Sequence, residues 1–208
     1  MNEKRRGTHL IDPLVARGHT LKTDRGLSLI ELLVTISIIT VITTILLVRH
    51  GQFSGQILLT NLAYEVALSI REAQVYGLGS KESPIGSSNF NVGYGVHFDA
   101  ANAAYFIFFA DLNNNHRYDG VGELLKQYET RYGNRITDFC GISAGGSSQC
   151  AAQGSVSYLD ITFLRPNPDA FLFTSAGSAY HSASVSVTSP QNFTRSVTVY
   201  STGQISVQ

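Results

Sequence analysis

The chain has 208 residues, which is enough for one globular domain and an accessory segment. Its formal net charge is zero, but residues 1–26 hold six basic and three acidic side chains, whereas the remainder holds nine basic and twelve acidic ones. The main body is therefore mildly acidic, which argues against nucleic acid as a partner, and its many Gly, Ser, Thr and Tyr residues favour strands and turns over a helical bundle.

A long apolar segment follows the basic N-terminal region. From Leu27 to Val48, fifteen of the 22 residues are Leu, Ile or Val, and Glu31 is the one charged side chain. As a helix this segment would be about 33 Å long, enough for a hydrocarbon core of roughly 30 Å. The aliphatic residues favour insertion by roughly 5–9 kcal/mol, whereas one acid costs about 3 kcal/mol or less. The segment therefore predicts a transmembrane helix, with its N-terminus cytoplasmic because six Lys and Arg precede it and Arg49 alone closely follows.

An ordinary single-pass anchor and an uncleaved signal peptide are the simpler interpretations of this segment. A secretory signal has an apolar core of about 7–15 residues followed by a small-residue cleavage site. This core is longer, and the following RHGQFSG contains no A-x-A site. An ordinary anchor, in turn, has no need of Glu31.

The stretch GLSLIELL, residues 26–33, resembles the N-terminal signature of type IV prepilins and type II secretion pseudopilins. In that family a peptidase on the cytoplasmic face cuts after the glycine, the new N-terminus is methylated, and a glutamate lies fifth after the cut. The resemblance implies cleavage between Gly26 and Leu27, methylation of Leu27, and a role for Glu31 in assembly. Arg25 also fits. Leu27 departs from the usual Phe, and a leader of residues 1–26 is long for the family.

The resemblance suggests a physical role for Glu31. Cleavage would give Leu27 an α-amine that is positively charged at neutral pH unless it is strongly desolvated. When the apolar helices of two subunits pack together, Glu31 of one can face that amine on its neighbour. In a low dielectric such a pair is strong, and removing one partner costs roughly 3–5 kcal/mol. We therefore expect Glu31 to set the register of assembly.

Residues 49–79 predict an amphipathic continuation of the helix. Gly51 and Gly55 weaken a helix by up to about 1 kcal/mol each and suggest a bend or a locally unwound stretch. We expect one long helix, or two collinear segments, from about Leu27 to Tyr76, stopped by the glycines at 77 and 79. The outer half should lie on a sheet through one apolar face, which consists of Leu58, Leu62, Val66, Ile70 and Ala73.

Residues 80–208 predict a β-rich globular domain, because short apolar or alternating runs are separated by Gly, Asn, Ser and Pro. Residues 80–89 are the expected flexible loop. The tail RSVTVYSTGQISVQ predicts a final hairpin and is similar to the closing hairpin of GspH/FimT-type minor pilins and pseudopilins. The fold class is thus α+β and pilin-like, with an antiparallel sheet region. The expected strands are 92–98, 104–110, 124–131, 156–164, 170–174, 183–187, 195–201 and 204–207.

The stretch DLNNNHRYDGVGE offers a candidate calcium site, since alternating oxygen ligands in a tight turn can surround Ca²⁺. The pattern departs from an EF-hand, because His116 stands where Gly is required and Gly122 stands where the final Glu is required, so that Glu123 comes one residue too late. The alternative is a β-hairpin whose Asx turns satisfy backbone N–H groups, and the stretch resembles a hairpin of GspH/FimT-type domains that is read without metal. The candidate ligands are Asp111, Asn113, Asn115, Asp119 and Glu123.

Cys140 and Cys150 are the only cysteines, and an even number in an exported domain favours a disulfide. A Gly- and Ser-rich loop of nine residues separates them, and closing it is worth roughly 2–3 kcal/mol in a chain-entropy model. Within that loop GISAG, residues 141–145, formally matches G-x-S-x-G. A nucleophile elbow requires a helix after the serine, and GSSQC is not helical, so a hydrolase centred on Ser143 is a weak third hypothesis.

The leading hypothesis is a structural subunit rather than an enzyme, with no required cofactor. It would sit in the inner membrane with its C-terminal domain outside the cytoplasm and then enter a pilus or pseudopilus. Its expected partners are other pilin or pseudopilin subunits, the prepilin peptidase, the inner-membrane assembly platform and membrane lipid, but not nucleic acid. The alternative is an uncleaved, membrane-tethered binding module that uses residues 111–123.

Overall fold

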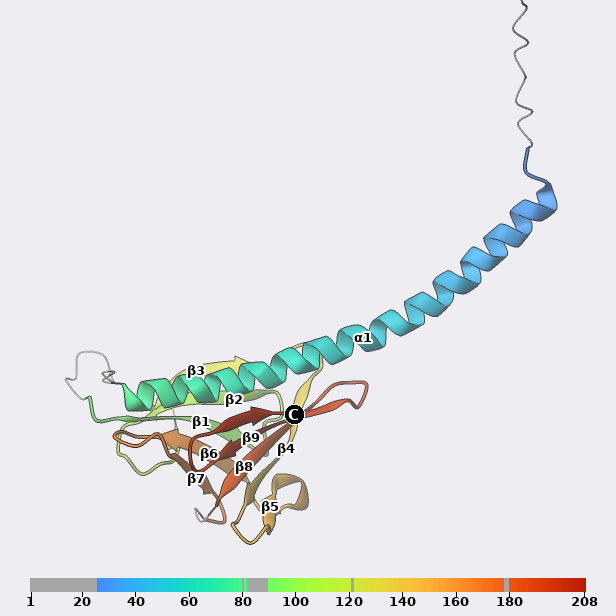
Figure 1. Cartoon of the computed structure of the whole chain (residues 1–208). Helices are drawn as coiled ribbons and strands as arrows, with labels where there is room; N and C mark the ends of the chain where they lie inside the picture. Colours follow the sequence, from blue (N-terminus) through green and yellow to red (C-terminus); the bar gives the residue numbers. More distant parts are fainter. Residues whose placement is uncertain (1–25, 80, 82–89, 121, 178–179) are drawn as a thin grey trace, which may run out of the picture. The chain divides into compact units, whose positions relative to one another are not determined.

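The structure is a computed structural model that describes residues 26–79, 81, 90–120, 122–177 and 180–208. For residues 48–54 it describes the backbone alone. The chain divides into two compact units, one ending at Thr44 and the other running from Ile45 to Gln208. Helix α1, Leu29–Leu78, contributes residues to both units (Figure 1). The expected loop at 80–89 lies outside the described residues apart from Lys81.

Helix α1 is a single uninterrupted helix of 50 residues. It continues through Gly51 and Gly55 without an unwound stretch, so the two-segment alternative is wrong. A Cβ at Gly55 would lie 2.5 Å from Oε1 of Gln191, between β8 and β9, and the end of that flexible side chain could move aside. Gly79 directly follows the end of the helix, as expected.

Gly77, expected as a stop, lies inside the helix. A Cβ at this position would lie only 2.2 Å from the carbonyl oxygen of Phe163 in strand β6, and the Gly77 carbonyl accepts the backbone N–H of Arg165 at 3.1 Å. Glycine therefore lets the last turn of α1 contact the sheet backbone directly.

The C-terminal part of α1 buries one face against the strands (Figure 1). Leu62, Val66, Ile70 and Ala73 are buried as predicted, but Leu58 is half-exposed. Leu59 is buried instead, because the buried face is a broad apolar stripe that includes residues between the predicted positions. The buried face consists of Leu59, Leu62, Ala63, Val66, Ala67, Ile70 and Ala73.

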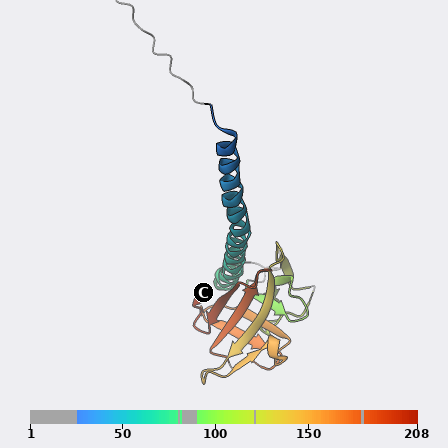
Figure 2. The same ribbon diagram turned by 90° about the vertical axis from the view of Figure 1, so that its right-hand side faces the viewer.

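The described strands form two five-stranded antiparallel sheets. Sheet A has the order β3-β2-β1-β6-β7, and sheet B has the order β10-β9-β8-β4-β5. Together with α1, the two sheets enclose one hydrophobic core (Figure 2). This confirms the α+β, pilin-like class. The bounds are β1 Gly93–Asp99, β2 Tyr105–Asp111, β3 Leu124–Glu129, β4 Arg135–Ile142, β5 Ser148–Cys150, β6 Tyr158–Phe163, β7 Ala170–Thr174, β8 Ser182–Thr188, β9 Thr194–Tyr200 and β10 Ile205–Val207, with a short 3₁₀ helix η1 at Ala151–Gln153.

All eight expected strands are present, and the final hairpin pairs β9 with β10 as predicted. Strands β4 and β5 were not expected. In β4, Ile136 and Phe139 are both buried although they lie three residues apart, because the pairing with β8 shifts register between Ile136 and Asp138. Such a bulge removes the period-two alternation by which a strand is recognised. Strand β5 is only three residues long and lies in the Gly- and Ser-rich stretch.

Candidate functional site

The segment Leu29–Leu47 is the helix in the described residues that is long and apolar enough to cross a membrane, by length and composition. None of its side chains is buried within the chain. Three of its four threonine hydroxyls donate to carbonyls of the preceding turn: Thr35 to Leu32 at 2.9 Å, Thr40 to Ile36 at 2.7 Å and Thr44 to Thr40 at 2.8 Å. These hydroxyls therefore need no water, which suits an apolar surrounding.

Glu31 lies in the first turn of α1. A carboxylate there is favoured by the exposed N–H groups and the positive end of the helix dipole. Its side chain is exposed, and among the described residues it forms no ion pair. The acid is thus held at the N-terminal end of the helix and is available to a group outside this chain.

Gly26 and Leu27 precede the first turn and are exposed. A Cβ added to Gly26 would meet no atom within 4 Å. No contact within the described part of the chain therefore requires glycine here.

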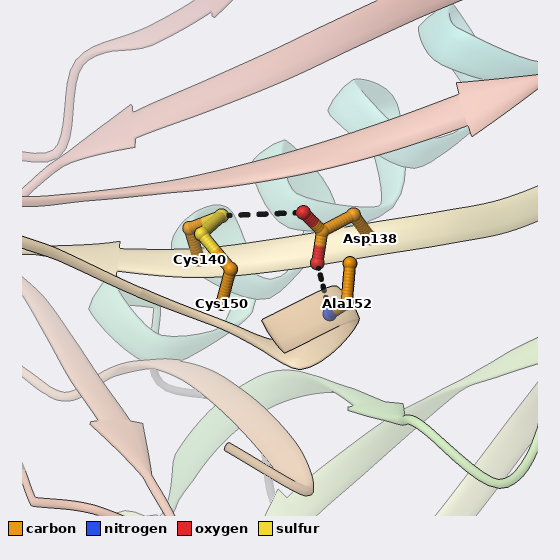
Figure 3. The surroundings of a disulfide bond; sticks show 4 residues. All are labelled: Asp138, Cys140, Cys150 and Ala152. Carbon is orange, nitrogen blue, oxygen red and sulfur yellow. Dashed lines mark hydrogen bonds between the residues drawn. A yellow bond between two sulfur atoms is a disulfide. The ribbon is translucent and has the colours of Figure 1, made fainter. Parts of the chain in front are cut away.

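Cys140 and Cys150 form a disulfide with an S–S distance of 2.01 Å, as predicted (Figure 3). The two residues face each other across the β4–β5 pair. Figure 3 shows Asp138 beside the bond, where its Oδ1 accepts the backbone N–H of Ala152 at 2.8 Å and so fixes the first turn of η1. These three side chains lie close enough to resemble a metal site, but the cysteine sulfurs are bonded to each other and offer no thiolate.

The five candidate calcium ligands lie in the connection between β2 and β3, which we call the 111–123 loop; Val121 is outside the described residues. Asp111 is fully buried, and its two carboxylate oxygens accept the backbone N–H groups of Asn115 at 3.0 Å and His116 at 2.8 Å. Asn114 and His116 adopt left-handed backbone conformations, with φ of 57° and 63°. The buried carboxylate thus holds a tight turn.

Glu123 closes the same loop from its other end. Its Oε1 accepts the N–H of Leu112 at 3.1 Å and its Oε2 the N–H of Asp119 at 2.8 Å. The Asp119 carboxylate accepts both Asn113 Nδ2 at 2.7 Å and Asn115 Nδ2 at 2.6 Å. Burial raises the pKa of the Glu123 carboxyl, and the two backbone donors oppose that shift.

The structure therefore brings all five residues together, as predicted, and shows the hairpin with Asx turns. Asn113 Oδ1 accepts the N–H of Asn115 at 3.1 Å, and Asn115 Oδ1 accepts the N–H of Arg117 at 2.8 Å. Both carboxylates at the ends of the loop are engaged by backbone donors, so a structural role accounts for them. Calcium binding stays the alternative hypothesis for this loop, beside the metal-free hairpin.

The 111–123 loop packs on the outer side of sheet A through cationic and aromatic side chains. The Arg117 guanidinium lies over the rings of Tyr158, 5.4 Å from the ring centre, and Phe173, at 5.0 Å. The His116 ring stacks on Phe171 with centres 3.9 Å apart. Burial lowers the pKa of His116, and nearby Asp111 opposes this.

Beneath the loop, a partly buried histidine pairs with a buried aspartate, which the sequence did not indicate. His97 Nδ1 is 2.7 Å from Oδ1 of Asp160, whose exposure is 1%. Burial raises the pKa of the Asp160 carboxyl, and its bond to His97 lowers it in part. The two residues lie on adjacent strands, and their pairing depends on the β1–β6 register, which sequence reasoning did not provide.

Ser143 lies in the turn between β4 and β5, where its hydroxyl donates to the Ser147 carbonyl at 3.2 Å. Its N–H bonds the same carbonyl at 2.9 Å. The turn after the serine leads into strand β5 and not into a helix, so the G-x-S-x-G match lacks the strand–turn–helix context of a nucleophile elbow.

Comparison with known proteins bears on the N-terminal segment. Residues 21–47 match the family model described as prokaryotic N-terminal methylation motif. The chain carries a prepilin-type N-terminus. The motif is that of the type IV prepilin and pseudopilin family, and it supports anchoring in the membrane through the N-terminal helix. No curated protein and no solved structure matches the chain.

Proposed function

We propose that the chain is a structural subunit, of the minor GspH/FimT type, of a type IV pilus or a type II secretion pseudopilus. The observation that carries the proposal is the methylation motif at residues 21–47, whose described part includes the exposed apolar helical segment Leu29–Leu47 with one acid in its first turn. The two-sheet domain that follows, with its closing β9–β10 hairpin, supports the subtype.

Processing would start on the cytoplasmic side of the inner membrane, where the peptidase removes residues 1–26 and Leu27 is methylated. The six basic residues before the helix favour this orientation. The new α-amine of one subunit would then pair with Glu31 of a neighbour while the apolar helices pack together. The assembly platform would extract the subunit from the lipid into the filament, and the globular unit would remain outside the cytoplasm.

Mass spectrometry of the protein extracted from membranes of its native host tests processing. The expected mature N-terminus is Leu27, heavier by one methyl group, and a Gly26→Val variant should retain the leader. A functional protein that keeps residues 1–26 would instead support the uncleaved binding module.

A Glu31→Ala variant tests assembly separately from processing. It should insert in the membrane with the same globular fold, because the side chain forms no ion pair with another described residue, but it should be missing from sheared filaments or pseudopili. Normal incorporation of this variant would refute the pairing with the α-amine.

A further inference from the structure

Two connections lie together at the end of the globular unit where α1 enters it. The β8–β9 loop lies beside the helix, since a Cβ on Gly55 would be 2.5 Å from Oε1 of Gln191. The β3–β4 turn lies beside this loop, since a Cβ on Gly133 would be 2.9 Å from Cγ of Pro190. We call these two segments, residues 130–135 and 188–195, the proximal tip (Figure 1).

The proximal tip lies close to the end of the apolar segment of α1. Gly55 follows Leu47, where that segment ends, by eight positions, and it is therefore about 12 Å further along the continuous helix. The headgroup layer of a bilayer extends roughly 5–8 Å beyond the hydrocarbon core on each side. The distance that remains, about 4–7 Å, is shorter than the Debye length of about 8 Å at physiological ionic strength. With the apolar segment in a bilayer, charges on the tip therefore interact with the headgroups.

The proximal tip is cationic, although the chain after residue 26 is acidic as a whole. It holds three of the nine basic residues of that part and none of the twelve acidic ones. The three are Arg131, Arg135 and Arg195; all are exposed, and none forms an ion pair with another described residue. Glu129, the acid nearest to them in sequence, leaves them unpaired. The tip therefore presents an excess of positive charge to its surroundings.

The β3–β4 turn carries an exposed aromatic residue in an unfavourable backbone conformation. Tyr132 is 71% exposed and has a φ of 59°, and Gly133 follows it with a φ of 74°. Positive φ at both central positions is typical of a type I′ turn, whose first central position favours Asn, Asp or Gly. Neither the turn nor the exposure of the ring within the described chain accounts for a tyrosine here. Membrane–water interfaces favour tyrosine, because its ring is apolar and its hydroxyl is polar.

We propose that the proximal tip binds the surface of an anionic phospholipid bilayer, with its three arginines on lipid phosphates and Tyr132 at the level of the headgroups. The proposal rests on the membrane anchoring of α1 in the proposed function. Guanidinium groups bind phosphate oxygens through paired, charge-assisted hydrogen bonds, and each basic side chain close to an anionic surface strengthens the attraction. The contact fixes the rotation of the globular unit about α1 while the subunit is in the membrane.

The position of the tip favours lipid over a second protein as the partner. Because α1 itself anchors the chain, the bilayer surface is always within reach of the tip, and contact with it is in effect an intramolecular step. An acidic protein neighbour would have to be recruited to the same place. The lipid surface therefore has the higher effective concentration, and its phosphates match the tip in charge.

Fluorescence quenching in nanodiscs tests the contact. The full chain, one copy per disc, is placed in phosphatidylcholine with or without phosphatidylglycerol, and a fixed fraction of the lipid carries a nitroxide on its headgroup. The native cysteines are bonded to each other, so a Thr194→Cys variant supplies one thiol for a fluorophore at the tip. The matched control is Thr202→Cys. Both threonines are exposed, but they lie at opposite ends of β9, which are about 20 Å apart.

Phosphatidylglycerol should increase the quenching at position 194 and leave that at position 202 unchanged, and added salt should reverse the increase. In the Thr194→Cys background, Arg131→Gln should lower the ratio of docked to undocked chains by about two- to fivefold. Replacing all three arginines of the tip by glutamine should remove the effect of phosphatidylglycerol. Arg71→Gln removes one exposed charge from α1, sixteen positions beyond Gly55, and should leave the ratio unchanged.

A Tyr132→Asn variant separates lipid binding from folding. Asparagine suits the left-handed turn, so the Tm of the variant should equal or exceed that of the natural chain. Its quenching at position 194 in phosphatidylglycerol should nevertheless fall, because the interfacial ring is lost. A variant that keeps the full quenching would overturn the role of Tyr132 at the headgroups.

Two results would overturn the lipid contact as a whole. One is equal quenching at position 194 with and without phosphatidylglycerol. The other is protection of the Thr194→Cys thiol from a water-soluble maleimide only in a host that has the assembly system, which would assign the tip to a protein neighbour. Both leave the proposed function intact if Leu27 is methylated in the native host, whereas a functional chain that keeps residues 1–26 would overturn the proposed function instead.

Discussion

A Gly77→Ala substitution distinguishes a helix propensity effect from a packing effect, because the two predict opposite signs. In an exposed helix interior, alanine is more stable than glycine by about 1 kcal/mol. In this structure the new Cβ would lie 2.2 Å from the Phe163 carbonyl oxygen, 2.8 Å from its carbonyl carbon and 3.0 Å from its Cβ.

The overlap cannot be relieved by a side-chain rotation, since the nearest atoms belong to the backbone of β6. Either the end of α1 or strand β6 must move by roughly 1 Å, and overpacking of this kind costs about 1–3 kcal/mol or more. Because the overlapping atoms are backbone, the cost should lie at the upper end of this range, about 2–3 kcal/mol, and we expect a net destabilisation of about 1–2 kcal/mol after the gain of about 1 kcal/mol in helix propensity. For a chain of this size, this corresponds to a fall in Tm of roughly 2–8 °C.

The assay is thermal unfolding of the full chain in detergent micelles, followed by near-ultraviolet circular dichroism of the tyrosines. The matched control is Gly145→Ala, in the β4–β5 turn, where a Cβ would meet no atom within 4 Å. The control should leave Tm unchanged or slightly raised. If Gly77→Ala unfolds at the same or a higher temperature than the natural chain, the close approach of α1 to β6 is refuted.

Three further predictions concern the globular unit. Replacing Cys140 and Cys150 together by serine should lower the free energy of unfolding by roughly 2–3 kcal/mol, measured by urea titration, and an unchanged midpoint would show that the disulfide constrains nothing. Asp111→Ala should cost about 2–4 kcal/mol because two backbone N–H groups lose their buried acceptor, and chelation of calcium should leave the Tm of the natural chain unchanged; a calcium-dependent Tm that Asp111→Ala abolishes would instead establish the metal site. The pKa of His116 is lowered in the folded state, so folding opposes its protonation and stability should fall as the pH drops below 6.5, its unperturbed value. Asn tolerates the left-handed backbone at this position, so a His116→Asn variant should lose less stability than the natural chain as the pH falls. Unfolding scans at several pH values measure this, and an equal loss of stability in the two proteins would contradict the role of His116.

The sequence was informative wherever a pattern is local. The apolar run, the period of the helix face and the alternation in the last hairpin each depend on neighbours within a few residues, and all three are present in the structure. The error of one position in the buried face, Leu58 for Leu59, arose because several apolar residues lie side by side there. Choosing among them requires the rotation of the helix about its axis.

Features that depend on pairing between distant strands were not predictable in the same way. The bulge in β4 hides its alternation, and the contact between His97 and Asp160 needs the register of β1 against β6. The candidate residues of the 111–123 loop could be named because they are close in sequence. Their backbone partners, by contrast, follow from the left-handed turns at Asn114 and His116.

The threonines of the apolar helix have a consequence for its passage between two surroundings. Thr35, Thr40 and Thr44 bond to carbonyls of their own helix, so their hydroxyls keep the same partners whether the neighbours are acyl chains or other helices. The sideways transfer out of the bilayer that the proposed function requires would therefore leave the hydrogen bonds of these three hydroxyls intact.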